Sequence, residues 1–104
     1  MIIEMRTYLL QPAKVPEYLR IYQAEGLAVQ TRILGNLIGY FYSEIGPLNQ
    51  IVHMWGYEDF AERSRRRAEL SKNADWLACV GKMMPLIITQ ENKILLGAPF
   101  SPIK

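Results

Sequence analysis

The chain has 104 residues, of which 50% are hydrophobic and 21% are charged, a balance typical of a globular domain and not of a disordered segment. Its net charge of +2 is too small for the broad basic surface that nucleic-acid binding needs, and no apolar run approaches the roughly 20 residues of a membrane helix. The single cysteine, Cys79, cannot form an intrachain disulfide, which favours a reducing compartment.

The first residues carry no export signal. Neither a basic region nor a cleavage site of the signal-peptide type follows Met1. We therefore expect a cytoplasmic protein with no membrane partner and no nucleic-acid partner.

The first third of the chain predicts a strand followed by a helix. Residues 2–10 alternate between two faces in the manner of a strand. Pro16 fits the first turn of a helix, and apolar residues then recur at helical spacing. Gly26 interrupts this pattern, which predicts a kink or close packing there, and Gly35 is a suitable C-terminal stop.

The middle of the chain predicts a β-hairpin. Residues 37–45 and 50–57 both have strand composition, and turn-forming residues 46–49 separate them. On the second of these strands, four side chains share one face: Ile51, His53, Trp55 and Tyr57.

A second helical segment and a last strand complete the pattern. Asp59 followed by Glu62 resembles a capping box, which predicts a helix start at this point. Residues 72–74 should break or bend this helix, residues 86–96 read as a strand, and residues 97–104 predict an irregular tail.

The element order predicts an α+β fold of the ferredoxin-like βαββαβ type. Two helices can cover only one face of the sheet, so the other face needs a partner. We expect the uncovered face to carry Tyr8, Tyr40, Tyr42 and Trp55, and two such sheets to meet in a homodimer. The predicted architecture is therefore a dimeric α+β barrel.

Several motifs together resemble the NIPSNAP family, and the resemblance spans nearly the whole chain. It implies one NIPSNAP-like domain over residues 1–104, with a ferredoxin-like fold of the dimeric α+β barrel superfamily. Superfamily relatives include cofactor-independent monooxygenases, an analogy at the level of the fold alone. The residues that carry the resemblance are Arg6-Thr7-Tyr8, the run from Gly46 to Trp55, Tyr57, Glu62-Arg63, Arg66, Arg67, Leu70 and Trp76.

The first and third strands carry the strongest candidate for a ligand site. Arg6 and Tyr8 share a face, and His53 and Trp55 should lie across from them on an adjacent strand that we expect to run parallel. Arginine offers a planar fork for a carboxylate or phosphate, while Tyr and Trp supply an apolar wall with one donor each. These residue types favour a small acidic or aromatic ligand.

Three further residues complete the predicted ligand site: Tyr57, Arg63 and Trp76. Arg63 can share one side of its helix with Arg66 and Arg67, but a solvated face with salt bridges is the favoured interpretation of these arginines. Trp76 heads an apolar stripe and is expected in the core first and in a pocket wall second.

His53 is the candidate catalytic residue, because its reference pKa lies near neutrality. The alternative is a strand histidine whose nitrogens are satisfied by neighbours, since no triad partner is close in sequence. For Arg6, the alternative to a ligand is an ion pair with Glu4, Glu44 or a carboxylate of the partner chain. No spacing of His, Cys and acidic residues predicts a metal site.

Two functions remain open from the sequence: a homodimer that binds a small molecule without a cofactor, and a non-catalytic interaction module. A cofactor-independent monooxygenase or isomerase is the enzymatic version of the first. A cavity of a few hundred Å3 would favour ligand chemistry, and a packed interior would favour the module.

Overall fold

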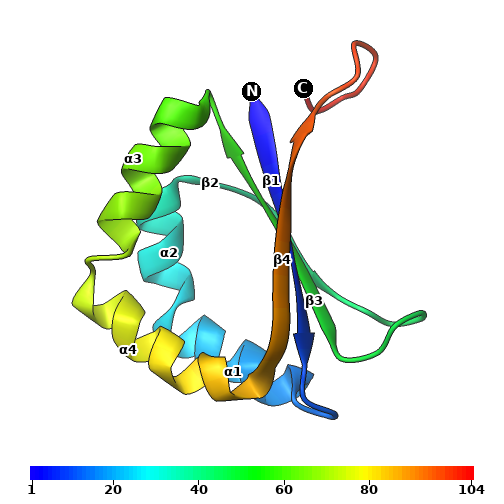
Figure 1. Cartoon of the computed structure of the whole chain (residues 1–104), viewed down its shortest axis with the longest axis vertical. Coiled ribbons are helices and arrows are strands. Elements are labelled where there is room, and N and C mark those ends of the chain that lie inside the picture. The colour runs from blue at the N-terminus through cyan, green and yellow to red at the C-terminus, as the bar shows by residue number, and fades with distance from the viewer.

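A computed structural model describes all 104 residues and shows one sheet with every helix on the same side of it (Figure 1). The four strands follow the order β2-β3-β1-β4, and each neighbouring pair is antiparallel. This arrangement confirms the α+β, ferredoxin-like prediction. The elements are β1 (Ile2–Leu10), α1 (Val15–Glu25), α2 (Leu27–Leu34), β2 (Asn36–Tyr42), β3 (Gln50–Tyr57), α3 (Phe60–Leu70), α4 (Ala74–Met83), a 3-10 turn (Met84–Leu86) and β4 (Ile87–Leu96).

Each of the two predicted helical segments is divided in two, at the positions that the sequence indicated. Gly26 separates α1 from α2, and a Cβ atom there would lie 2.9 Å from the sulfur of Cys79, so the junction packs closely on α4. Asn73 caps α4 by accepting a hydrogen bond from the backbone of Trp76. Asp59 caps α3 in the same way.

The second strand is shorter than predicted, because it ends at Tyr42 and not at residue 45. Residues 43–49 form the connection to β3. Gly46 and Asn49 both have positive φ values, 112° and 63°, which turn the chain away from the extended path. Residues 97–104 contain no helix or strand, and no helix of the structure is both long and apolar enough to cross a membrane.

The face of the sheet that the helices cover differs from the one predicted. Tyr8 and Trp55 are buried beneath the helices of their own chain, at 8% and 0% exposure, so they do not form an uncovered apolar face. Strand geometry directs the alternate residues of β1 and β3 to the opposite side of the sheet. No helix lies on that side (Figure 1). That uncovered face carries Met5, Val52 and Met54.

Candidate functional site

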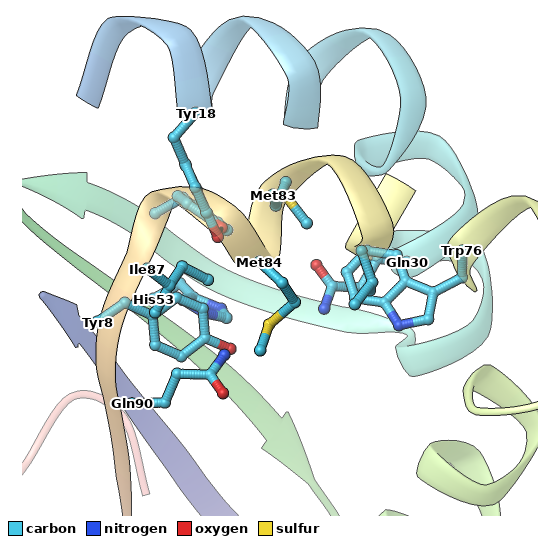
Figure 2. A pocket seen from close by; sticks show the side chains of 11 residues that line it. Tyr8, Tyr18, Gln30, His53, Trp76, Met83, Met84, Ile87 and Gln90 are labelled. Carbon is cyan, nitrogen blue, oxygen red and sulfur yellow. Dashed lines mark hydrogen bonds between the residues drawn. The ribbon is translucent and has the colours of Figure 1, made fainter. Parts of the chain in front are cut away.

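A small cavity lies between the covered face of the sheet and helices α1, α2 and α4 (Figure 2). Its volume is about 40 Å3. Three of the predicted site residues, Tyr8, His53 and Trp76, contribute to its wall. The full lining is Tyr8, Tyr18, Gln30, Tyr40, His53, Trp76, Val80, Met83, Met84, Ile87 and Gln90.

His53 is held in one tautomer by its neighbour on β3. The indole Nε1–H of Trp55 donates to Nδ1 of His53 over 2.8 Å, and an indole nitrogen can only donate. The proton of the neutral imidazole must therefore be on Nε2. His53 is only 1% exposed, and its Nε2 atom is buried without a hydrogen-bond partner within the chain.

Aromatic rings hold the imidazole on both sides. Tyr40 stacks on it with ring centroids 4.5 Å apart, and Tyr8 meets it edge to face at 5.0 Å. Burial, together with the positive charges of Arg6 and Arg67, lowers the pKa of His53 to about 3, against the opposing effect of Glu4. At neutral pH His53 is therefore an uncharged hydrogen-bond donor, and its second nitrogen is occupied.

The stability of the fold is expected to fall by about 2 kcal/mol between pH 7 and pH 5, because of His53 alone. The unfolded histidine takes up a proton below its ordinary pKa of 6.5, whereas the folded one resists protonation until about pH 3. Protonation therefore favours the unfolded chain as the pH falls. Urea titrations at pH 7, 6 and 5 measure this slope, and a His53→Gln variant should lose it because the chain has no other histidine. An unchanged slope in the variant would contradict the assignment.

Glu4 lies at the centre of a buried ionic network next to the cavity. Its carboxylate accepts two hydrogen bonds from Arg63, at 3.2 and 2.7 Å, one from Arg6 at 3.0 Å and one from Asn92 at 2.6 Å. Burial by itself would raise the pKa of Glu4, but these donors and the nearby arginine charges lower it to about 2. Arg6 then reaches toward the cavity, because its Nε donates to the hydroxyl of Tyr8 over 2.9 Å.

Two expectations need correction: the relative direction of β1 and β3, and the environment of the arginines on α3. Arg6 lies opposite His53 as predicted, but β1 and β3 are antiparallel and not parallel. The arginine side of α3 forms salt bridges as predicted, such as Arg66 with Glu62 at 3.5 Å, but it is not a fully solvated face. Arg63 binds the buried Glu4, and Arg66 donates to the carbonyl of Ile33 over 2.9 Å. Both contacts follow from the position of α3, which places this side of the helix over β1 and the end of α2.

Arg6 forms an ion pair with Glu4, one of the partners that the sequence offered in place of a ligand. Arg6 does not line the cavity. Trp55 is packed behind His53, and Tyr57 has a buried hydroxyl without a hydrogen-bond partner. Neither Trp55 nor Tyr57 lines the cavity, and Arg63 is absent from its wall as well. The cavity therefore brings together only part of the predicted set.

Four residues with polar groups in the cavity wall were missed by sequence reasoning: Tyr18, Gln30, Tyr40 and Gln90. Gln30 is a buried polar residue on the apolar side of α2, and its Oε1 accepts a hydrogen bond from Tyr22. A lone amide among apolar helix positions was the available signal. The hydroxyls of Tyr18 and Tyr40 share a hydrogen bond of 2.8 Å, and burial raises the pKa of both groups.

Titratable groups elsewhere do not assemble into a metal-ligand set: no cluster of three or more His, Cys, Asp or Glu side chains has suitable geometry. The polar groups in the cavity wall are aromatic hydroxyls, the amides of Gln30 and Gln90, and the imidazole of His53. Cys79 is buried, and burial raises the pKa of its thiol.

The fold and cavity define a class of small α+β proteins in which one antiparallel sheet is covered on one side by helices. A family model described as NIPSNAP matches residues 3–102, and the chain therefore belongs to the NIPSNAP family. A NipSnap homolog of Dictyostelium discoideum is 38% identical over 93 residues, which cover 89% of this chain and 41% of that protein. The chain thus spans about two fifths of the length of this relative.

Solved structures agree closely with this fold. A crystal structure from Agrobacterium tumefaciens is 44% identical, covers 100% of both chains and superposes with a TM-score of 0.98. A NIPSNAP-like domain protein from Burkholderia xenovorans is 50% identical, with 97% of this chain and 88% of that one covered and a TM-score of 0.94.

A more distant likeness extends the fold beyond the family. A protein from Nitrosomonas europaea, described as a putative antibiotic biosynthesis monooxygenase, superposes with a TM-score of 0.69 at 11% identity, over 93% of this chain and 98% of that one. At this identity the likeness concerns the fold alone.

Proposed function

We propose that this chain forms a homodimer and binds a small acidic or aromatic molecule in the cavity between its sheet and its helices. The observation that carries the proposal is the Nε2–H of His53, a buried donor with no partner in the chain on a residue that lines the cavity. A buried polar hydrogen without an acceptor costs about 1–3 kcal/mol, and a bound ligand or water can remove that cost.

The cavity favours recognition over proton-transfer catalysis. A general base needs a free lone pair and a pKa near the working pH. His53 has neither, because Trp55 occupies Nδ1 and the pKa is about 3. Glu4 is also unsuited, since its carboxylate is engaged by Arg6, Arg63 and Asn92. The oxygenase and isomerase alternatives therefore have less support from this geometry than ligand binding.

The cavity volume restricts what can enter. About 40 Å3 is well below the few hundred Å3 expected of a complete ligand pocket, so the volume by itself favours the interaction module. The space holds a few water-sized groups at most. We propose that the polar end of the ligand occupies this space and that its remainder extends past Met84. Met84 is 46% exposed, and an unbranched thioether side chain repacks readily.

The proposed dimer interface is the uncovered face of the sheet. Met5 and Met54 face each other across β1 and β3 near its centre, and Val52 lies beside them. Phe41 on β2 and Leu95 on β4 extend the same face and remain 52% and 37% exposed. Lys93 and Glu91 of β4 lie at the edge of this face, opposite Met5 and Thr7. An exposed apolar patch of this kind is typically buried in an interface, and a second copy of the chain has a matching one.

Native mass spectrometry of the purified protein tests both parts of the proposal. We expect a species of about twice the 12.0 kDa chain mass that carries a small additional mass. A Met54→Lys variant should give a folded monomer, because it places a charge at the centre of the interface. A His53→Phe variant should remain dimeric and lose the additional mass.

The outcomes separate the alternatives. A dimer without any bound molecule, in wild type and variant alike, would favour the interaction module over the ligand site. A well-behaved wild-type monomer would contradict the barrel assembly. Tyr42→Phe is the matched control, because Tyr42 is an aromatic residue of β2 that is 56% exposed and lies outside the cavity wall.

A further inference from the structure

We propose that the group bound in the cavity is a carboxylate, held between the Nε2–H of His53 and the hydroxyl proton of Tyr8, and that Arg6 is the positioning residue that directs this hydroxyl. The ligand is then a small monocarboxylic acid with an apolar body. This inference rests on the proposed ligand site and narrows it to one chemical class.

The direction of the Tyr8 proton follows from its hydrogen bond with Arg6. A guanidinium group can donate but never accept, so the oxygen of Tyr8 is the acceptor in the 2.9 Å contact with Arg6 Nε. The hydroxyl proton of Tyr8 must therefore point elsewhere, and no acceptor within the chain takes it. Because Tyr8 lines the cavity, this proton is available to a group inside it.

His53 presents the same kind of group from the adjacent strand. Its proton is fixed on Nε2 by the contact with Trp55, and its ring lies 5.0 Å from that of Tyr8. Gln30 adds further donors, because its carbonyl oxygen is already used by Tyr22 and its amide hydrogens remain. Gln90 adds one carbonyl oxygen and two amide hydrogens to the wall. The polar part of the wall thus still offers hydrogens in excess of acceptors, the pattern that suits an oxyanion.

The electrostatic potential favours the same sign of ligand. Arg6 and Arg67 both disfavour protonation of His53, so they create a positive potential at the imidazole. Glu4 opposes them, but Arg6 and Arg63 pair with its carboxylate. Three guanidinium groups against one carboxylate leave an excess of positive charge next to the cavity, and such an excess stabilises a bound anion in a poorly solvated site.

The rest of the wall is mostly apolar and indicates the body of the ligand. Val80, Met83, Met84 and Ile87 line the remaining sides together with the ring of Trp76. In the view of Figure 2, Met84 lies between the side of the cavity formed by Tyr8 and His53 and the side formed by Gln30 and Trp76. A carboxylate head with an aromatic or aliphatic body matches this division.

The test compares benzoate with its neutral isostere benzamide, using the imidazole of the only histidine as the reporter. In protein with 15N-labelled histidine, the NMR spectrum of the free protein should show the tautomer of His53 with its proton on Nε2. Benzoate should move the Nε2–H resonance, and calorimetry should show that it binds at least tenfold more tightly than benzamide. Equal affinity for the two probes would overturn the carboxylate assignment and leave the ligand site itself intact.

Variants test the roles of Tyr8 and Arg6. Tyr8→Phe should weaken benzoate binding about tenfold and leave benzamide binding nearly unchanged, whereas Tyr42→Phe should change neither. Arg6→Met should reduce the preference for benzoate in the same way, and Arg6→Lys should restore part of it because an ammonium group can also donate to the Tyr8 oxygen. A uniform loss for both probes would indicate a merely structural role for Arg6 and overturn its assignment.

If neither probe moves the Nε2–H resonance although native mass spectrometry detects a bound molecule, the carboxylate inference is wrong and the proposed function stands. If no molecule is bound and no probe binds, both are wrong.

Discussion

Trp55→Ala is expected to lower the free energy of unfolding by about 3–5 kcal/mol, the usual cost of truncating a fully buried aromatic residue. The indole is 0% exposed, and it packs with Val29, Ile33 and Leu70 in the part of the core under α2 and α3. The substitution also removes the donor to His53 Nδ1, so the imidazole loses the contact that fixes its tautomer. Urea denaturation at pH 7 measures the loss.

A matched truncation at the surface provides the control. Leu77 lies on α4 and is 52% exposed, so Leu77→Ala should change stability by about 0.5 kcal/mol or less. Trp55→Phe separates the two roles of the indole, because it keeps most of the apolar volume but removes the N–H group. A loss below about 1 kcal/mol in Trp55→Ala would contradict the core position of this residue.

Glu4→Gln is expected to cost about 3 kcal/mol at pH 7. The pKa of Glu4 is lowered from 4.5 to about 2 in the folded chain, and each unit corresponds to about 1.4 kcal/mol. The group binds protons less readily when folded, so its stabilising effect is complete above pH 4.5 and is lost as the pH falls toward 2. Removing the charge also leaves the guanidinium groups of Arg6 and Arg63 without their carboxylate.

The pH profile provides an internal check, because wild type and Glu4→Gln should converge in stability as the pH falls below 4.5. Glu25→Gln is the control, since Glu25 pairs with Lys82 at 2.7 Å on the surface, where such pairs contribute about 1 kcal/mol or less. Equal losses for Glu4→Gln and Glu25→Gln would contradict the buried network.

Local patterns in the sequence predicted the elements well. Alternation predicted β1 over residues 2–10 and β3 over residues 50–57, because successive side chains of a strand point to opposite faces of the sheet. The capping residue Asp59 located the start of α3, since its side chain bonds the backbone three residues further on. Residues 72–74 were predicted only as a break, and there Asn73 caps α4. The spacing of His53 and Trp55 on one face likewise anticipated their contact.

The choice of the covered face could not be predicted in the same way. Both faces of β1 and β3 carry apolar residues, and the inner one also carries Glu4 and Arg6, which alternation alone assigns to solvent. Only the network with Arg63, 59 residues away from Glu4, makes burial of that carboxylate possible. Contacts over such separations depend on how α3 lies across the sheet, which no local pattern records.

The helix α3 is attached to the rest of the molecule mainly by polar contacts. Leu70 is its only buried residue, and two polar contacts connect the helix to β1 and α2: the ion pair of Arg63 with Glu4 and the hydrogen bond from Arg66 to Ile33. The helix α1, in contrast, buries Tyr18, Ile21 and Tyr22. Salt and acid should therefore promote local opening of α3, whereas opening of α1 should be promoted mainly by denaturants such as urea, which solvate apolar groups. The two ends of one helical layer thus loosen under different solvent conditions.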